Sequence, residues 1–271
     1  MKNMNYNKLQ VLAANTAAIE TAYQVRNEKR TTTAAERETL SLYSGFGGIK
    51  EVLDLGTNIP TSEKMKQSLN HLACVLQSIA QGDETLYREL VDSIKASVLT
   101  AFYTPKFLIE AVADQIQATF QANGLLMKSF LEPSAGIGGF LPVSMSDTYK
   151  AAFEKDLATG LVLSALHPDA RVIVDGFETI GAQELEHGSF DVIASNIPFG
   201  TINVFDADFE RRGTPYKQSL KAIHNYFFIK AMELLNEGGL LAFITSRGVA
   251  DSPSNRFVRD YLVHHAHISP P

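Results

Sequence analysis

The sequence predicts an α/β protein in which a helical amino-terminal region precedes a doubly wound, mostly parallel sheet. Two observations predict this class. Residues 1–100 carry apolar side chains at helical spacing and show no strand pattern. From about residue 128, short apolar runs alternate with helical stretches, which is typical of parallel strands joined by crossover helices. We therefore expect one domain over 1–100 and a second over 101–271.

The helical region begins with the amphipathic segment KLQVLAANTAAIETAYQV at 8–25. A capping box from Thr33 to Glu36 opens the next helix, which ends at the glycines of YSGFGGIK at 43–50. We interpret those glycines as a helix stop and a packing turn, because they follow a helix and not a strand. Two more amphipathic segments lie near 62–80 and 84–98.

The second region contains five apolar runs that predict strands: SFLEP, KAAFEKD, ARVIVDGF, FDVIASN and GLLAFITS. Between them, LATGLVLSALHP and YKQSLKAIHNYFFIKAMELLNEGG predict helices. A further helix, SNRFVRDYLVHH, follows the fifth run. The last residues, AHISPP, have the pattern of a sixth strand that is just beginning.

The composition is that of an ordinary globular protein, with 45% hydrophobic and 20% charged residues among 271. The single Cys74 excludes an internal disulfide framework and suits a reducing cytosol; we expect it to be a buried apolar residue. A polar amino terminus and the lack of a long apolar run predict neither signal peptide nor membrane span, and hence a cytoplasmic protein. The HHAH stretch at 264–267 lacks a carboxylate or thiol partner, so we expect no metal site.

The net charge of −6 bears on nucleic-acid binding, because a free-standing DNA-binding protein is usually basic. If nucleic acid is the substrate, the positive surface must be local or must lie on another part of a longer protein.

Candidate ligand-binding residues follow the first two predicted strands, because ligands of an open parallel sheet bind beyond the carboxyl ends of its strands. In LEPSAGIGGF, Gly136 and Gly138 allow a tight turn, and Glu132 places a carboxylate before it. The spacing is not that of a dinucleotide-binding loop. After the second run, Glu154 is positioned to accept hydrogen bonds from ribose hydroxyls, although a solvated surface acid would give the same pattern.

Beyond the third run, Asp175 could accept from an adenine amino group and Phe177 could pack on the ring. A glycine loop, a ribose acid and a base-contacting acid on consecutive strands together predict a nucleoside-bearing cofactor. The fourth run ends in SNIPFG, where an amide, a rigid turn and an aromatic ring follow a buried strand. This stretch is either a base-binding turn or a strand stop with a buried Phe199.

In this order, the stretches FYTP, LEPSAGIGGF, FEKD, VDGF, NIPF and EGGLLAFITS resemble the N6-adenine DNA methyltransferases. Their order resembles the gamma class, which includes the modification subunits of type I restriction systems. Together with YSGFGGIK, HNYFFIKAM and ITSRGVADS, they resemble the methylase-like region of large phage and conjugative-element methylase–helicase proteins. The resemblance covers roughly residues 40–271, and NIPF with EPSAGIGGF is its specific part.

The resemblance implies S-adenosylmethionine as cofactor and DNA, with an adenine flipped out of the duplex, as substrate. It implies that Glu154 holds the ribose, and that either Asp175 or Phe177 is the residue aligned at the adenine, since Gly176 separates the two. The other implied cofactor-binding residues are Tyr103, Thr104, Pro105, Glu132, Pro133, Ala135, Gly136 and Gly138. In the family's chemistry Asn196 and the Ile197 carbonyl accept from N6, Pro198 fixes the turn, and Phe199 stacks on the base.

The resemblance also implies parts that lie outside this sequence. Such enzymes close their sheet with further strands and carry a target-recognition domain, so we expect a fragment of a longer polypeptide or a natural truncation. A cytosine-C5 enzyme would need a nucleophilic cysteine near the fourth strand, and Cys74 is far from it in sequence.

The stretch after Gly200 is a long polar loop, and it carries candidate DNA contacts at Arg211 and Arg212. Nearby acids almost cancel this charge, so a solvated loop is an equal alternative. His224 and Asn225 begin the next helix and are candidates for the base pocket. Two other functions stay open: methyl transfer to a protein glutamine or an RNA guanine, and a cofactor- or DNA-binding module without turnover in a helicase or anti-restriction assembly.

Overall fold

The computed structural model describes residues 7–55, 62–100, 103–183, 185 and 189–267. The chain forms two compact units, each built from several stretches of sequence. The first unit comprises Met1–Tyr103, Gly136–Gly138 and Glu154–Val174, and the second comprises Thr104–Ala135, Gly139–Phe153 and Asp175–Pro271. The first unit thus includes two segments from the predicted second domain, and the boundary near residue 100 stays a prediction.

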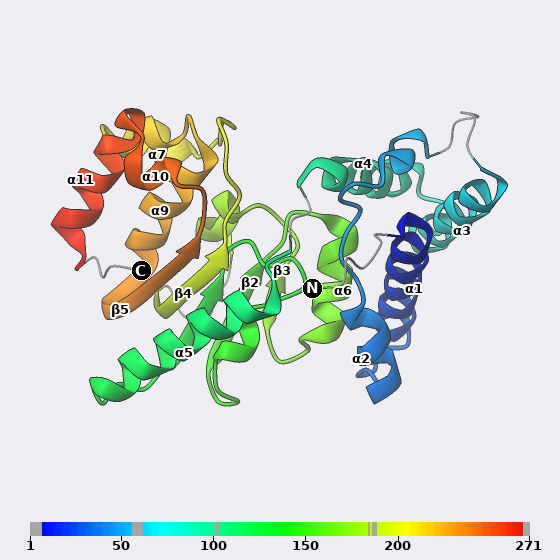
Figure 1. Cartoon of the computed structure of the whole chain (residues 1–271), viewed down its shortest axis with the longest axis horizontal. Helices are drawn as coiled ribbons and strands as arrows, with labels where there is room; N and C mark the ends of the chain where they lie inside the picture. The colour runs from blue at the N-terminus through cyan, green and yellow to red at the C-terminus, as the bar shows by residue number, and fades with distance from the viewer. Residues whose placement is uncertain (1–6, 56–61, 101–102, 184, 186–188, 268–271) are drawn as a thin grey trace. The chain divides into compact units, whose positions relative to one another are not determined.

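The first unit is mainly helical (Figure 1). Its elements are α1 (Lys8–Asn27), α2 (Ala34–Ser41), the 3-10 turn η1 (Lys50–Asp54), α3 (Glu63–Ala80), α4 (Glu84–Thr100), α6 (Leu157–Leu166) and β3 (Arg171–Ile173). Helix α1 packs against α2, α3 and α6. The predicted capping box is present, because the Thr33 side chain accepts from Glu36 N and the Glu36 side chain accepts from Thr33 N.

The glycine-rich stretch 43–50 is a packing turn, as the sequence predicts. Tyr43 and Phe46 are buried, and Gly45 has a φ of +67°. The side chain of Asn15 holds the turn: its Nδ2 donates to Gly45 O at 2.5 Å and its Oδ1 accepts from Ser44 N at 2.9 Å. The turn therefore fixes Tyr43, whose hydroxyl lies 2.9 Å from Thr159 Oγ1 on α6.

The second unit contains most of the sheet. Its elements are α5 (Lys106–Ala122), β1 (Ser129–Glu132), η2 (Leu141–Val143), β2 (Tyr149–Phe153), η3 (Phe177–Ala182), β4 (Phe190–Asn196), α7 (Ala207–Arg211), α8 (Tyr216–Ser219), α9 (Ile223–Leu234), β5 (Leu235–Ile244), α10 (Gly248–Asp251), η4 (Pro253–Asn255) and α11 (Arg256–His265). The strand order is β3-β2-β1-β4-β5. β1 pairs in parallel with β2 and β4, and β4 pairs in parallel with β5.

This order has a switch point between β1 and β4, because the chain adds strands on one side of β1 and then on the other. Strand β1 is buried along its whole length, and β4 is almost entirely buried. Such apolar strands suit the centre of a parallel sheet. Helices α5 and α9 both pack on β5, and α5 crosses in front of the sheet in Figure 1. The predicted α/β fold with a parallel sheet is confirmed.

Three details differ from the sequence predictions. The helix expected over 216–239 is divided into α8 and α9, and Asn236 to Gly239 belong to β5. Ala222 is extended between the two helices, with a φ of −148°. Cys74 is exposed because the apolar face of α3 is formed by its neighbours Leu72, Val75 and Leu76. The expected sixth strand lies mostly outside the described residues. None of the described helices is long and apolar enough to cross a membrane.

Candidate active site

The turn after β4 holds an amide and an exposed ring at the switch-point edge of the second unit. Asn196 ends β4 and is half-buried, and it lies opposite Ile244 of β5. Ile197 is 1% exposed, and its N–H donates to Ile244 O at 3.1 Å. Phe199 is 52% exposed. Phe199 therefore does not end the strand as a buried side chain. Its ring is exposed enough to stack on a planar ligand.

The loop after β1 is fixed beside this turn within the second unit. Ser195 Oγ donates to Ser134 O at 2.8 Å, which ties the end of β4 to the loop. Glu132 is 1% exposed, and both of its carboxylate oxygens accept a hydrogen bond from Phe140 N at 3.2 Å. The Glu132 carboxylate thus closes the loop from 132 to 140. Pro133 and Ala135, also predicted at this loop, are buried.

Three predicted cofactor-binding residues come together within the first unit. Glu154 Oε2 accepts from Gly136 N at 2.7 Å, and Glu154 Oε1 accepts from Asp156 N at 2.8 Å. A Cβ added to Gly136, whose φ is +56°, would lie 3.3 Å from the ring of Tyr103. Burial raises the pKa of Glu154 to about 7, although its hydrogen bonds from backbone N–H groups oppose the shift. Glu154 is thus not the solvated surface acid that the sequence left as an alternative.

Tyr103 packs edge-on against Tyr43, with the ring centroids 6.4 Å apart. Burial, with the nearby charge of Glu154, raises the pKa of Tyr103 well above its ordinary value, so its hydroxyl keeps its proton at neutral pH. Thr104 is half-buried, and Pro105 is the exposed cap residue of α5.

Gly138 is the position in the loop where a side chain would be least tolerated. Its φ is +81°, and an added Cβ would lie 2.6 Å from His167 Nε2 and 2.8 Å from Leu163 Cδ1. The His167 ring cannot easily move, because its Nε2 lies 3.0 Å from Ile137 O. Glycine is therefore required for both its backbone angle and its close approach to α6.

We expect Gly138→Ala to lower the free energy of unfolding by about 2–4 kcal/mol, because backbone strain and a clash add. Gly82→Ala is the matched control, since Gly82 has a φ of +88° but nothing within 4 Å of the added Cβ. Its loss should be about 1 kcal/mol, from strain alone. Urea unfolding followed by circular dichroism measures both. Equal losses in the two variants would contradict the close packing at Gly138.

Asp175 and Phe177 have different environments. Asp175 is exposed, and its Oδ1 accepts from Gly176 N at 2.7 Å. Phe177 is 2% exposed, and its ring packs against Phe153 and Phe227 with centroid distances of 5.9 and 5.1 Å. A carboxylate open to solvent can accept from a ligand without rearrangement, whereas the Phe177 ring is part of the core.

The segment from 201 to 222 is folded rather than an open loop, because Asp206 anchors it to α9. Asp206 is 7% exposed, and it accepts from Tyr226 Oη at 2.8 Å, from Lys230 Nζ at 3.0 Å and from Phe209 N at 3.1 Å. Burial acts to raise the pKa of Asp206, but these hydrogen bonds and the Lys230 charge outweigh it and hold the pKa below its ordinary value.

Replacing Asp206 with alanine should lower the free energy of unfolding by about 2–4 kcal/mol at pH 7, because Lys230, whose side chain is 12% exposed, and the buried Tyr226 hydroxyl would lose their shared partner. The matched control is Asp208→Ala, since the side chain of Asp208 is 56% exposed where it pairs with Arg211 and Arg212 and should contribute within about 0.5 kcal/mol. Denaturant unfolding measures both losses. A loss at Asp206 no greater than at Asp208 would show that the anchor contributes nothing to stability.

The two arginines predicted to contact DNA differ in how strongly they are already held by other residues. The Arg211 side chain is 76% exposed. Arg212 lies 3.3 Å from the ring centroid of Tyr216 and pairs with Glu233 at 2.6 Å. A phosphate contact by Arg212 would compete with these interactions. His224 and Asn225 are buried at the start of α9, and His224 Nδ1 lies 3.3 Å from Gly200 N.

Sequence reasoning missed Asn255, which hydrogen-bonds to Asn225 across 30 residues of chain. It counted Asp206 only as a charge that offsets the neighbouring arginines. The local contacts of Asp206, which caps α7, do not reveal its role as an anchor, because that role depends on Tyr226 and Lys230 in α9. The contact of Asn255 with Asn225 likewise reaches a distant segment.

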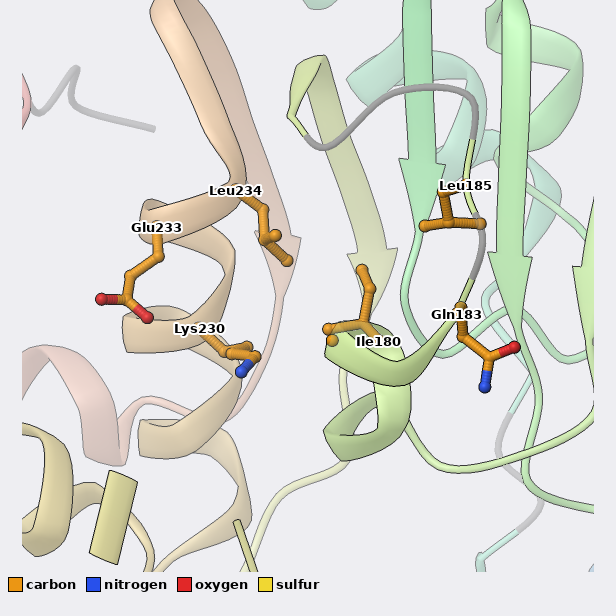
Figure 2. A pocket seen from close by; sticks show the side chains of 7 residues that line it. Ile180, Gln183, Leu185, Lys230, Glu233 and Leu234 are labelled. Atoms are coloured by element: carbon orange, nitrogen blue, oxygen red, sulfur yellow. The ribbon is translucent and has the colours of Figure 1, made fainter. Parts of the chain in front are cut away.

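A hollow of about 490 Å³ elsewhere in the second unit is not a candidate active site (Figure 2). It is lined by Ile180, Gly181, Gln183, Leu185, Lys230, Glu233 and Leu234. None of the residues predicted for the site lines this hollow. Its two charged residues are already paired, Lys230 with Asp206 and Glu233 with Arg212.

Two solved structures are similar in fold to this chain. One is a class I S-adenosylmethionine-dependent methyltransferase from Listeria monocytogenes, with a TM-score of 0.53 and 15% identity, covering 95% of this chain and 79% of that one. The other is the methyltransferase subunit of a type I restriction-modification system from Streptococcus thermophilus, with a TM-score of 0.51 and 13% identity, covering 97% and 75%.

Two comparisons of sequence agree with the fold. The chain is 26% identical over 162 residues to the "Defense against restriction protein B" of Escherichia phage P1, a match that spans 59% of this chain and 7% of the relative. Residues 147–270 match the family model of the Eco57I restriction-modification methylase. This matched region contains β2, Glu154 and the turn from Asn196 to Phe199. The stretch 147–270 is therefore similar to the Eco57I restriction-modification methylases, within a chain that has the class I methyltransferase fold.

Proposed function

We propose that this chain transfers a methyl group from S-adenosylmethionine to the N6 amino group of an adenine in DNA. The observation that carries the proposal is the turn after β4. There, the Asn196 amide and the Ile197 backbone lie at the switch-point edge, and Phe199 is 52% exposed beside them.

The turn matches the chemical need of an exocyclic amine. The N6 lone pair of adenine is delocalised into the ring, so the nitrogen is a poor nucleophile. If Asn196 Oδ1 and the Ile197 carbonyl accept the two N6 hydrogens, they favour a pyramidal nitrogen whose lone pair is available for attack. Phe199 would stack on the flipped base, an interaction that contributes roughly 1–3 kcal/mol. As the N–C bond forms, the methyl–sulfur bond of the cofactor would break and a neutral sulfide would leave, and the methylated nitrogen would then release its proton to water. No base is needed before the attack, so positioning and electrostatics would supply most of the rate.

The residues present fit the cofactor. The carboxylate of Glu154 uses three of its roughly four lone-pair sites on the N–H groups of Gly136, Asp156 and Lys155, which leaves an acceptor site for a ribose hydroxyl. Gly136 and Gly138 have positive φ angles that let the loop backbone turn tightly. When bound, the cofactor would supply an electrophilic methyl group. We propose that it is held by Tyr103, Thr104, Pro105, Glu132, Pro133, Ala135, Gly136, Gly138, Glu154 and Asp175. Phe177 is left out of this set because its ring is 2% exposed within the core.

On the substrate side we propose that Arg211 contacts a phosphate and that His224 and Asn225 lie beside the base pocket. The match spans only 7% of the phage P1 relative. We therefore propose that target recognition is completed by other domains of a longer polypeptide, which also agrees with the net charge of −6.

The test supplies labelled S-adenosylmethionine with unmethylated duplex DNA, RNA or a cell protein extract, and identifies the labelled product after digestion. We expect the label in N6-methyladenine. Label in a protein glutamine or an RNA guanine would replace the proposed substrate with that one. Cofactor binding by calorimetry without any labelled product would identify a binding module, and no cofactor binding would overturn the proposal as a whole.

A further inference from the structure

Three buried polar side chains gather behind the turn that ends at Gly200. His224, Asn225 and Asn255 are 8%, 3% and 7% exposed. Asn255 Nδ2 donates to Gly248 O at 2.8 Å, and Asn225 Nδ2 donates to Asn255 Oδ1 at 2.8 Å. His224 lies between the two loops, with Nδ1 at 3.3 Å from Gly200 N and Nε2 at 3.3 Å from Asn255 Nδ2.

The Gly248 carbonyl determines which way the Asn255 amide is oriented. A carbonyl can only accept, so the Asn255 amide must turn its nitrogen toward Gly248 and its oxygen toward Asn225. Both ring nitrogens of His224 then face N–H groups. Burial lowers the pKa of His224, which keeps the ring neutral, and a neutral ring can accept at only one nitrogen. With Nδ1 accepting from Gly200 N, the proton lies on Nε2, and the 3.3 Å approach of Nε2 to Asn255 Nδ2 is a packing contact rather than a hydrogen bond.

The network joins three separate segments of the second unit. Gly200 follows Phe199 directly, His224 lies in the first turn of α9, and Gly248 and Asn255 lie in the segment after β5. The backbone of Gly200 has a φ of +127°, a region that side chains rarely adopt. Without an external hold, such a glycine would let the turn sample other conformations.

We infer that His224 and Asn255 are positioning residues, which fix Gly200 and so hold the Phe199 ring and the Asn196 amide in one arrangement for the target base. The inference deepens the proposed function and rests on it for the identity of the base. Polar partners suit this role better than apolar ones because hydrogen bonds specify a single geometry. The Asn225 Oδ1 atom has no hydrogen-bond partner within the described residues, an exception of the kind that functional sites retain.

A fluorescent reporter can test the positioning without any enzymatic activity. The chain contains no tryptophan, so Phe199→Trp introduces a single indole at the turn. In this background, we expect Asn255→Ala or His224→Ala to at least double acrylamide quenching and to lower the residual anisotropy of the indole. His224→Asn keeps an acceptor near the Nδ1 position and should restore most of the ordered signal.

The matched control is Asn15→Ala, which removes an equally buried asparagine that bridges backbone groups in the first unit. It should reduce stability and leave the indole signal unchanged. All variants are measured well below their unfolding temperatures, with circular dichroism to show that they are folded. If folded His224→Ala and Asn255→Ala leave the indole as ordered as in their parent, the positioning role is wrong.

A second measurement uses the native Phe199. Asn255→Ala should lower kcat for methyl transfer about 10- to 100-fold, because a displaced reacting group loses rate steeply, while the Kd for the cofactor changes less than about twofold. An unchanged kcat in a folded Asn255→Ala protein would overturn the inference. If the unmutated chain transfers no methyl group to adenine, the proposed function fails, and the indole measurements still decide whether the network orders the turn.

Discussion

Asn196→Ala should lower kcat for methyl transfer to adenine by about 10²–10³-fold and leave the Kd for S-adenosylmethionine almost unchanged. The reason is that the substitution removes one of the two proposed acceptors for the N6 hydrogens, an interaction that develops fully only as the nitrogen becomes pyramidal. The size follows from the effect of removing a single polarising group at other active sites. Single-turnover assays with labelled cofactor measure the rate, and calorimetry measures cofactor binding.

Two companion variants make this result specific. Asn196→Asp keeps an oxygen acceptor at the same position and should retain more activity than Asn196→Ala. Asn203→Ala removes an exposed asparagine seven residues along the chain and should behave as the unmutated protein. If Asn196→Ala methylates adenine at the original rate, the base-binding turn is not the catalytic element.

The affinity for S-adenosylmethionine should fall as the pH drops below about 7, approaching tenfold per pH unit, and should level off above pH 8. Glu154 explains the direction, because burial raises its pKa to about 7 and its ionised carboxylate is the form proposed to bind the ribose. Glu154→Gln should bind more weakly above pH 7 and lose this pH dependence. Glu110→Gln, which changes an exposed acid on α5, should keep the original profile.

The raised pKa of Glu154 has the opposite effect on stability. A lower pH weakens cofactor binding, but it stabilises the folded state of the free protein. The pKa of Glu154 is raised above the ordinary 4.5, so the folded state binds the proton more tightly than the unfolded chain does. This contribution is present in full below pH 4.5 and is lost as the pH rises through 7, by on the order of 3 kcal/mol. Unfolding at pH 5.5 and 8 should therefore show a larger loss in the unmutated protein than in Glu154→Gln. A flat binding profile would exclude Glu154 from the cofactor site.

The strand ends could be found from the sequence because each depends on a local pattern. Glu154 follows an apolar run, and Asn196 comes shortly before a proline and an aromatic residue. The run of apolar residues predicts a buried strand and the proline predicts a turn, which together place both residues at the end of a strand. Burial of Glu154 could not be predicted, because it depends on packing within the first unit around Tyr103 and Gly136. Asp206 and Asn255 were missed for the same reason, since the contacts that join them to α9 reach Tyr226, 20 residues away, and Asn225, 30 residues away.

The interleaving of the two units limits how this protein can be divided. Glu154 and α6 belong to the same compact unit as the amino-terminal helices, and Ala158 and Val162 of α6 are fully buried in the core that those helices form. A recombinant product that starts at residue 101 would expose this apolar face and lose the Tyr43–Thr159 and Ser93–Asp156 contacts. The helices before residue 100 are therefore not a detachable appendage. Exchange of modules between related proteins would have to carry them together with the methylase sequence.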